Sequence, residues 1–147
     1  MAETILVRSD LSQRLIEAGR SLLAGLDQQS LAYEAAFWLL DEESAIWHLV
    51  LSSKAVKMDG SRALYHQVHK VLLALGLNGD IKITMISIVG DKTPIVKSLR
   101  DALGSAASVD GTRLDDAFLG SVRLPGCLLY RLSRRQKLQQ MTSQERK

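Results

Sequence analysis

Hydrophobic residues recur at three- and four-residue spacing from Leu11 to Leu26, which predicts an amphipathic helix. Asp10 is followed three residues later by Gln13, as in a capping box, so we expect this helix to begin near Asp10. Gly25 and the polar run at 27–30 are expected to end it. The apolar stripe consists of Leu11, Leu15, Ala18, Leu22 and Leu26.

Two segments rich in aromatic and branched residues follow at 33–40 and 45–53, and the polar stretch 41–44 between them predicts a β-hairpin. A four-residue loop would set Leu40 opposite Ala45 and Trp38 opposite Trp47. Alternation puts Ala36, Trp38, Leu40, Ala45, Trp47, Leu49 and Leu51 on one face, and Phe37, Leu39, Ile46, His48 and Val50 on the other. Both faces are largely apolar, so each needs a cover, from helices on two sides or from a second subunit.

A second helix is predicted from about Ser61 to Leu75, with Gly76 at the position that follows a helix end. Leu73 falls on its outer face beside His66 and His69. Its inner stripe consists of Leu64, Val68, Val71, Leu72 and Leu75.

The remaining elements are a strand at 81–89, a third helix, and strands near the C-terminus. Thr93 and Pro94 suit the first positions of the third helix, which is expected to end near Gly104. A strand near 112–118 precedes a hairpin with arms at 122–124 and 127–132, turning at Pro125-Gly126.

The predicted fold is one α+β domain over residues 1–132, with a mostly antiparallel five-stranded sheet and three helices in the order α-β-β-α-β-α-β-β. The segment 133–147 has no convincing apolar face. We expect it to be a basic tail that is frayed or disordered.

Charge is spread unevenly over the 147 residues. Residues 131–147 carry a net charge of +5, and the rest of the chain carries −2, so the overall basic character belongs to the tail. Basic arms attract phosphates, which suggests nucleic-acid contact through Arg131, Arg134, Arg135 and Lys137. The tail has no aromatic residue for stacking on bases, and a solubilising end is the alternative.

Composition also bounds the compartment. Cys127 is the single cysteine, so no internal disulfide can form, and no long apolar run suits a signal peptide or a bilayer span. We therefore expect a cytoplasmic protein without a membrane partner.

Several groups of residues could carry chemistry. His66 and His69 are neighbours on one helix, but a metal site would also need His48 from the sheet, and the helical wheel turns the pair away from it. The expectation is two solvated histidines, one packed histidine and no metal or cofactor. Gly90-Asp91-Lys92-Thr93 resembles the end of a phosphate loop, but Met85 replaces the first glycine, so a capped helix start is preferred.

Acidic and nucleophilic candidates are similarly weak. Asp80-Ile81-Lys82 with Asp59 has the loose outline of a metal-dependent nuclease, yet Asp59 precedes a helix. Adjacent residues of a strand point to opposite faces, so the acids at 115–116 would not share a metal. The serines at 52–53 lack a nucleophile-elbow context, and Cys127 is expected to be a small core residue.

Several segments are similar to those of an uncharacterised family of small bacterial proteins. They are Ala36-Phe37-Trp38, Trp47-His48-Leu49-Val50 with Ser52-Ser53, Ile86-Ser87-Ile88-Val89 and Leu129-Tyr130-Arg131-Leu132. The resemblance implies a single α+β domain and implies no chemistry.

The favoured function is that of a non-enzymatic interaction protein that self-associates as a homodimer. Trp38, Trp47, His66, His69 and Leu73 are its candidate interface residues. The alternatives are a nucleic-acid-associated accessory protein that uses the tail, and a metal-dependent hydrolase or nuclease.

Overall fold

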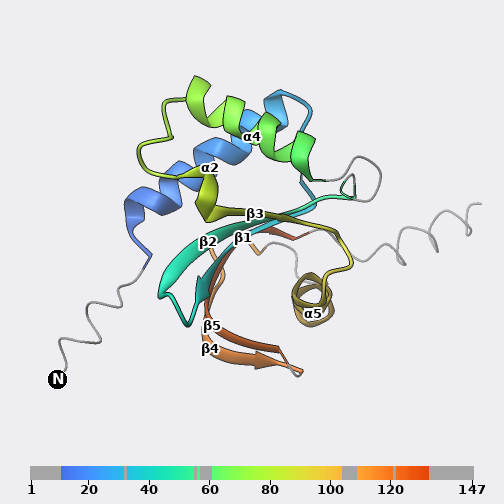
Figure 1. The fold of residues 1–147 in the computed structure, drawn as a ribbon. Coiled ribbons are helices and arrows are strands. Elements are labelled where there is room, and N and C mark those ends of the chain that lie inside the picture. Colours follow the sequence, from blue (N-terminus) through green and yellow to red (C-terminus); the bar gives the residue numbers. More distant parts are fainter. Residues whose placement is uncertain are drawn as a thin grey trace, which may run out of the picture.

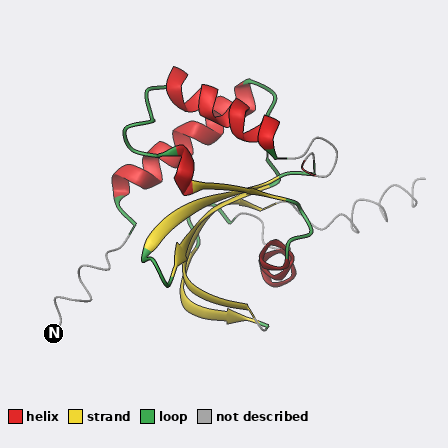
Figure 2. Cartoon of the chain, viewed as in Figure 1, coloured by secondary structure: helices red, strands yellow, loops and turns green. Residues whose placement is uncertain are grey.

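The structure is a computed structural model that describes residues 11–31, 33–54, 56, 61–103, 109–120 and 122–132. In these residues the predicted α+β class and the predicted order of elements are confirmed (Figures 1 and 2). The elements are α2 (Gln13–Gln28), β1 (Ala35–Asp41), β2 (Ile46–Ser52), α4 (Arg62–Ala74), the short 3-10 helix η1 (Ile83–Met85), β3 (Ile86–Val89), α5 (Pro94–Leu103), β4 (Arg113–Leu119) and β5 (Val122–Leu132).

The five strands form one mixed sheet in the order β3-β2-β1-β5-β4. The β1–β2, β1–β5 and β4–β5 pairs are antiparallel, and β2–β3 is parallel. Helices α2 and α4 cover one face, and α5 lies on the other (Figure 1). The sequence left open whether helices or a second subunit cover the two sheet faces. In the structure, helices of the same chain cover both.

Each face has its own buried cluster, and the predicted division between faces is confirmed for the hairpin residues that these clusters hold, whereas Ala45 lies in the turn. The face under α2 and α4, called here the α2/α4 face, includes Ala36, Trp38, Leu40, Trp47, Leu49 and Leu51. The opposite face, called the α5 face, includes Phe37, Leu39 and Val50, packed with Val96 and Leu99 of α5.

The register of the hairpin differs from the predicted one by two residues. Leu40 pairs with Trp47 and Trp38 with Leu49, so the two tryptophans share a face but are diagonal neighbours. The loop has four residues, as expected, but it begins one residue later, because Asp41 extends β1 and pairs with Ile46. Ala45 takes the left-handed conformation with φ +60°, and its N–H donates to the carbonyl of Asp41 at 2.7 Å.

The ends of α2 and α4 can be compared with the capping residues predicted from the sequence. Ser12 caps α2 by accepting from the Leu15 N–H at 3.1 Å, and the predicted cap, Asp10, lies outside the described residues. Gly76 has φ +70° after the end of α4, as predicted. Leu75 was placed on the inner stripe of that helix, but its side chain is 46% exposed.

Two strand predictions in the second half of the chain are corrected. The segment 81–89 is a strand only from Ile86, because Ile83–Met85 forms a 3-10 turn. No turn occurs at Pro125-Gly126, since Val122–Leu132 is one strand, and the hairpin turns beyond Leu119 instead. Pro125 lies past the last β1 partner of β5, Cys127, so its missing N–H costs that ladder nothing.

A buried tyrosine ties three elements together. The Tyr130 hydroxyl on β5 accepts from the indole N–H of Trp38 on β1 at 2.7 Å and donates to the carbonyl of Ile16 on α2 at 2.6 Å. The ring is buried, and the Arg20 guanidinium lies 5.4 Å from its centroid. Gly19 makes the approach possible, because a Cβ there would lie 2.4 Å from the hydroxyl oxygen.

We expect Tyr130→Phe to lower the free energy of unfolding by about 2 kcal/mol, because the indole N–H of Trp38 would be left buried without a partner and the bond to the Ile16 carbonyl would be lost. Tyr65→Phe is the control, since the Tyr65 side chain is half-buried and its hydroxyl accepts the Ile88 N–H of β3 at 2.9 Å without joining the sheet to α2. Urea denaturation measures both variants. Equal losses in the two variants would contradict a special role for the Tyr130 bridge.

Candidate functional site

The candidate interface residues fall into two groups. Trp38 and Trp47 are 0% and 6% exposed, so their side chains belong to the core of one chain rather than to its surface. On α4, His66 is exposed, His69 is half-buried and Leu73 is 51% exposed, as expected for an outward-facing residue. Any contact surface offered by this set therefore lies on α4.

The basic candidates divide at the end of β5. Arg131 donates to both carboxylate oxygens of Asp27 on α2, at 3.0 and 2.7 Å, and to the carbonyl of Tyr33 at 3.2 Å. It thus fastens β5 to the end of α2. Arg134, Arg135 and Lys137 lie outside the described residues.

The three histidines do not converge. His48 lies on the α5 face of β2, whereas His66 and His69 lie on α4, which covers the opposite face. In the part of the chain that the structure describes, no three His, Cys, Asp or Glu side chains gather as a metal-binding group would require.

The loop before α5 forms a tight turn. The Thr93 hydroxyl donates to the Gly90 carbonyl at 2.6 Å, and the Thr93 carbonyl accepts from the Lys97 N–H. Arg100 donates to the Asp91 carbonyl at 3.3 Å. These bonds describe a closed turn at the start of a helix.

The acidic candidates are held in surface ion pairs. Asp80 pairs with Arg14 at 2.7 Å and precedes a 3-10 turn, not a strand, while Asp59 lies outside the described residues. On β4, Asp115 pairs with Arg113 and Asp116 with Arg123.

The nucleophile candidates are buried. Ser52 and Ser53 are 0% and 8% exposed, and Cys127 is 0% exposed. Burial raises the pKa of the Cys127 thiol to about 12, which keeps it protonated and unreactive near neutral pH.

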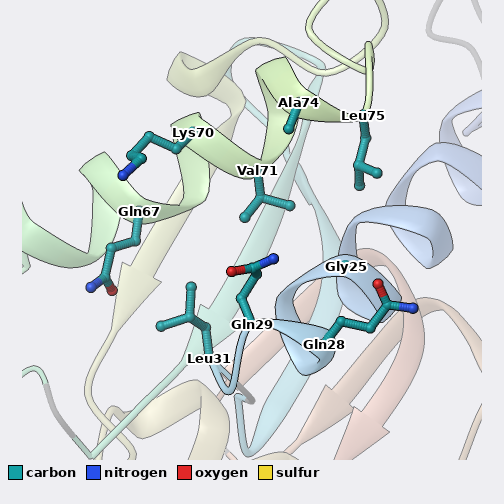
Figure 3. A pocket seen from close by; sticks show the side chains of 9 residues that line it. All are labelled: Gly25, Gln28, Gln29, Leu31, Gln67, Lys70, Val71, Ala74 and Leu75. Atoms are coloured by element: carbon teal, nitrogen blue, oxygen red, sulfur yellow. The ribbon is translucent and has the colours of Figure 1, made fainter.

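A groove lies between the end of α2 and α4 (Figure 3). Its volume is 380 Å³, and its apolar wall includes Leu31, Val71 and Leu75. Gly25 lets the helices approach closely, because a Cβ there would lie 2.8 Å from Leu75 Cδ1 and 3.1 Å from Val71 Cγ1. The polar side of the groove is formed by Gln28, Gln29, Gln67 and Lys70.

A second hollow, of 420 Å³, lies on the α5 face at the hairpin end of the sheet. It is lined by residues from four neighbouring strands, β3, β2, β1 and β5, which include Ser87, His48, Leu39 and Arg123. Sequence reasoning named His48 as a packed residue but missed this hollow. Alternation predicts the face of His48, whereas the position of Ser87 beside it depends on the strand order, which alternation does not reveal.

Comparison with known proteins adds no assignment: no protein-family model, no curated protein and no solved structure matches this chain. None of the described helices combines the length and apolar character that crossing a bilayer demands. The function must therefore be argued from the residues themselves.

Native Cys127 should not react with a thiol reagent such as 5,5′-dithiobis(2-nitrobenzoate), because its sulfur is buried and its pKa is raised. One equivalent of thiol should appear only after unfolding in guanidinium chloride. Release of one equivalent from the folded chain within the mixing time would contradict the burial of this residue.

Proposed function

We propose that the protein is a non-enzymatic interaction protein that self-associates through the exposed surface of α4. The supporting observation is Leu73, a large apolar side chain that is 51% exposed on the outer face of α4. Leu75 follows the end of this helix, is 46% exposed and lines the groove between α2 and α4. Residues two apart on a helix do not share a face, so we centre the contact on Leu73.

Uncovered sheet faces do not supply this contact surface. The expected homodimer rested on sheet faces that three helices might leave uncovered, but α2, α4 and α5 cover both within one chain. Among the described residues, the large apolar side chains that remain exposed are Leu73 and Leu75 at α4, Ile46 on the β1–β2 hairpin and, at 66%, Phe118 on β4. We centre the proposed contact on α4, which carries two of these four beside the groove that Leu75 lines.

Charge limits how two copies could meet. Helix α4 contains Arg62 and Lys70 and no acidic residue, so two α4 helices packed along their whole length would oppose like charges. A two-fold axis near Leu73 keeps Arg62 about 16 Å away along the helix. Lys70 lies only about 4.5 Å from Leu73 along the helix, so its long side chain has to extend toward solvent at the rim of the interface. The interface therefore centres on Leu73.

The measurement is the mass of the full chain by light scattering at micromolar concentration. We expect a mass near twice the 16.2 kDa of the chain. Leu73→Lys should return it to the monomer, because a charge would be buried at the interface centre. Ile46→Lys is the control, since Ile46 is similarly exposed, at 49%, but lies on the β1–β2 hairpin. A wild-type monomer throughout this range would refute self-association.

A second candidate is a nucleic-acid-associated accessory protein. Arg131 places the end of β5 against Asp27 on α2, so the basic segment that follows Leu132 starts beside the helical layer that carries Lys70. Cationic groups from both could contact the same phosphate backbone.

Binding of the full chain to a fluorescent DNA duplex tests this candidate. We expect affinity to fall steeply with salt, and deletion of 133–147 to remove most of it while leaving the melting temperature nearly unchanged. Lys70→Glu should weaken binding further, whereas Lys97→Glu on α5 serves as the control, since α5 covers the opposite face. Binding that survives the deletion would point away from the tail.

A further inference from the structure

The hollow on the α5 face combines an apolar interior with an uneven distribution of charge. Leu39 and Val50 face it from adjacent strands, and Pro125 closes it from β5. Helix α5 packs on the part of this face that holds Ala35 and Phe37, nearer the start of β1. The end of the face near the β1–β2 turn therefore remains open as a shallow hollow of 420 Å³, called the cavity below, which has the volume but not the depth of a typical small-ligand site.

The polar groups of the cavity come from separate elements. His48 and Ser87 are half-buried on β2 and β3, and they lie on the same face because Ser87 pairs with Val50, two residues from His48. The carboxylates of Asp41 and Glu42 stand at the rim, where β1 enters its turn. The interior can thus accept and donate hydrogen bonds beside an acidic rim.

The charge at the rim is fixed by its neighbours. The Ser44 hydroxyl donates to Asp41 at 2.8 Å, and with the Glu43 N–H it holds the pKa of Asp41 below its ordinary value. Arg123, the cation that lines the cavity, donates to Glu42 and to Asp116 at once. Because these two carboxylates already bind that guanidinium, the Asp41 carboxylate gives the cavity a net negative charge.

We infer that this cavity binds a small organic cation, in which an ammonium group meets Asp41 at the rim and an apolar or aromatic body enters between Leu39, Val50 and Pro125. The Ser87 hydroxyl and the His48 imidazole supply further hydrogen bonds to the ligand. This site is separate from the α4 surface, since the sheet lies between them.

The test is an NMR titration of the full ¹⁵N-labelled chain with three probes of similar size. They are 2-phenylethylammonium, the neutral 3-phenylpropan-1-ol and the anionic 3-phenylpropionate. The cation should shift the amide signals of Ser87 and His48 and bind about fivefold more tightly than the alcohol, which corresponds to one charge pair at high dielectric. The anion should bind most weakly.

Matched variants locate the charge. Asp41→Asn should remove the preference for the cation, whereas Glu43→Gln, which removes a carboxylate from the same turn but not from the cavity lining, should leave it intact. Because Asp41 also braces the turn, Ser87→Phe provides a second variant that fills the interior and should abolish shifts from all three probes. Equal affinity for the three probes, or shifts that avoid Ser87 and His48, would overturn the inference.

Discussion

The bridge made by the Tyr130 hydroxyl is the contact on which the arrangement of layers depends. One oxygen accepts from an indole on β1 and donates to a carbonyl on α2, so the sheet and its covering helix share a single buried hydrogen-bonded unit. A buried polar group is stabilising only when its partners are present, which makes the geometry of all three partners interdependent. Gly19 belongs to the same unit, because a Cβ there would collide with the Tyr130 hydroxyl and displace it from its two partners. Helix α4 packs against α2 at Gly25, where the groove also lies. The position of this surface therefore depends on α2 and on the bridge that holds α2 to the sheet.

The other face depends on an irregularity shared by β4 and β5. Leu114 and Leu119 are five residues apart, and Leu124 and Cys127 are three apart, yet all four join the cluster under α5. In a regular strand, residues an odd number apart point to opposite faces. Asp116, with φ +51°, lies opposite Pro125 in the pairing sequence, so both strands change face at the same level and the register is kept. The end of the hairpin can then reach α5 and carry Arg123 to the rim of the cavity.

The parts of the fold that could be predicted are those set by local sequence. The faces of β1 and β2 followed from alternation alone, and Gly76 from its tolerance of positive φ. The predicted register of the β1–β2 hairpin was wrong because it depended on whether Asp41 ends the strand or begins the loop. That difference of one residue moves the pairing by two. Pro125-Gly126 has the composition of a turn, but tertiary packing keeps it in a strand, where Gly126 leaves room for Trp47 at 2.7 Å from a notional Cβ. No local pattern contains that partner.

The candidate sites could likewise be predicted only where they depend on local sequence. Leu73 was found on the outer face because a helical wheel is a local property, and its exposure agrees. Asp41, His48 and Ser87 are distant along the chain, and they share a cavity only because β3 adds in parallel beside β2 while β1 pairs antiparallel on its other side. Strands β1 and β2 carry side chains to both faces, so each contributes to the core beneath α2 and α4 and to the cavity. The two surfaces are thus built on one shared sheet. Because protein interiors are close-packed and transmit strain, a volume change among the buried side chains of one face also acts on the backbone that positions the other face.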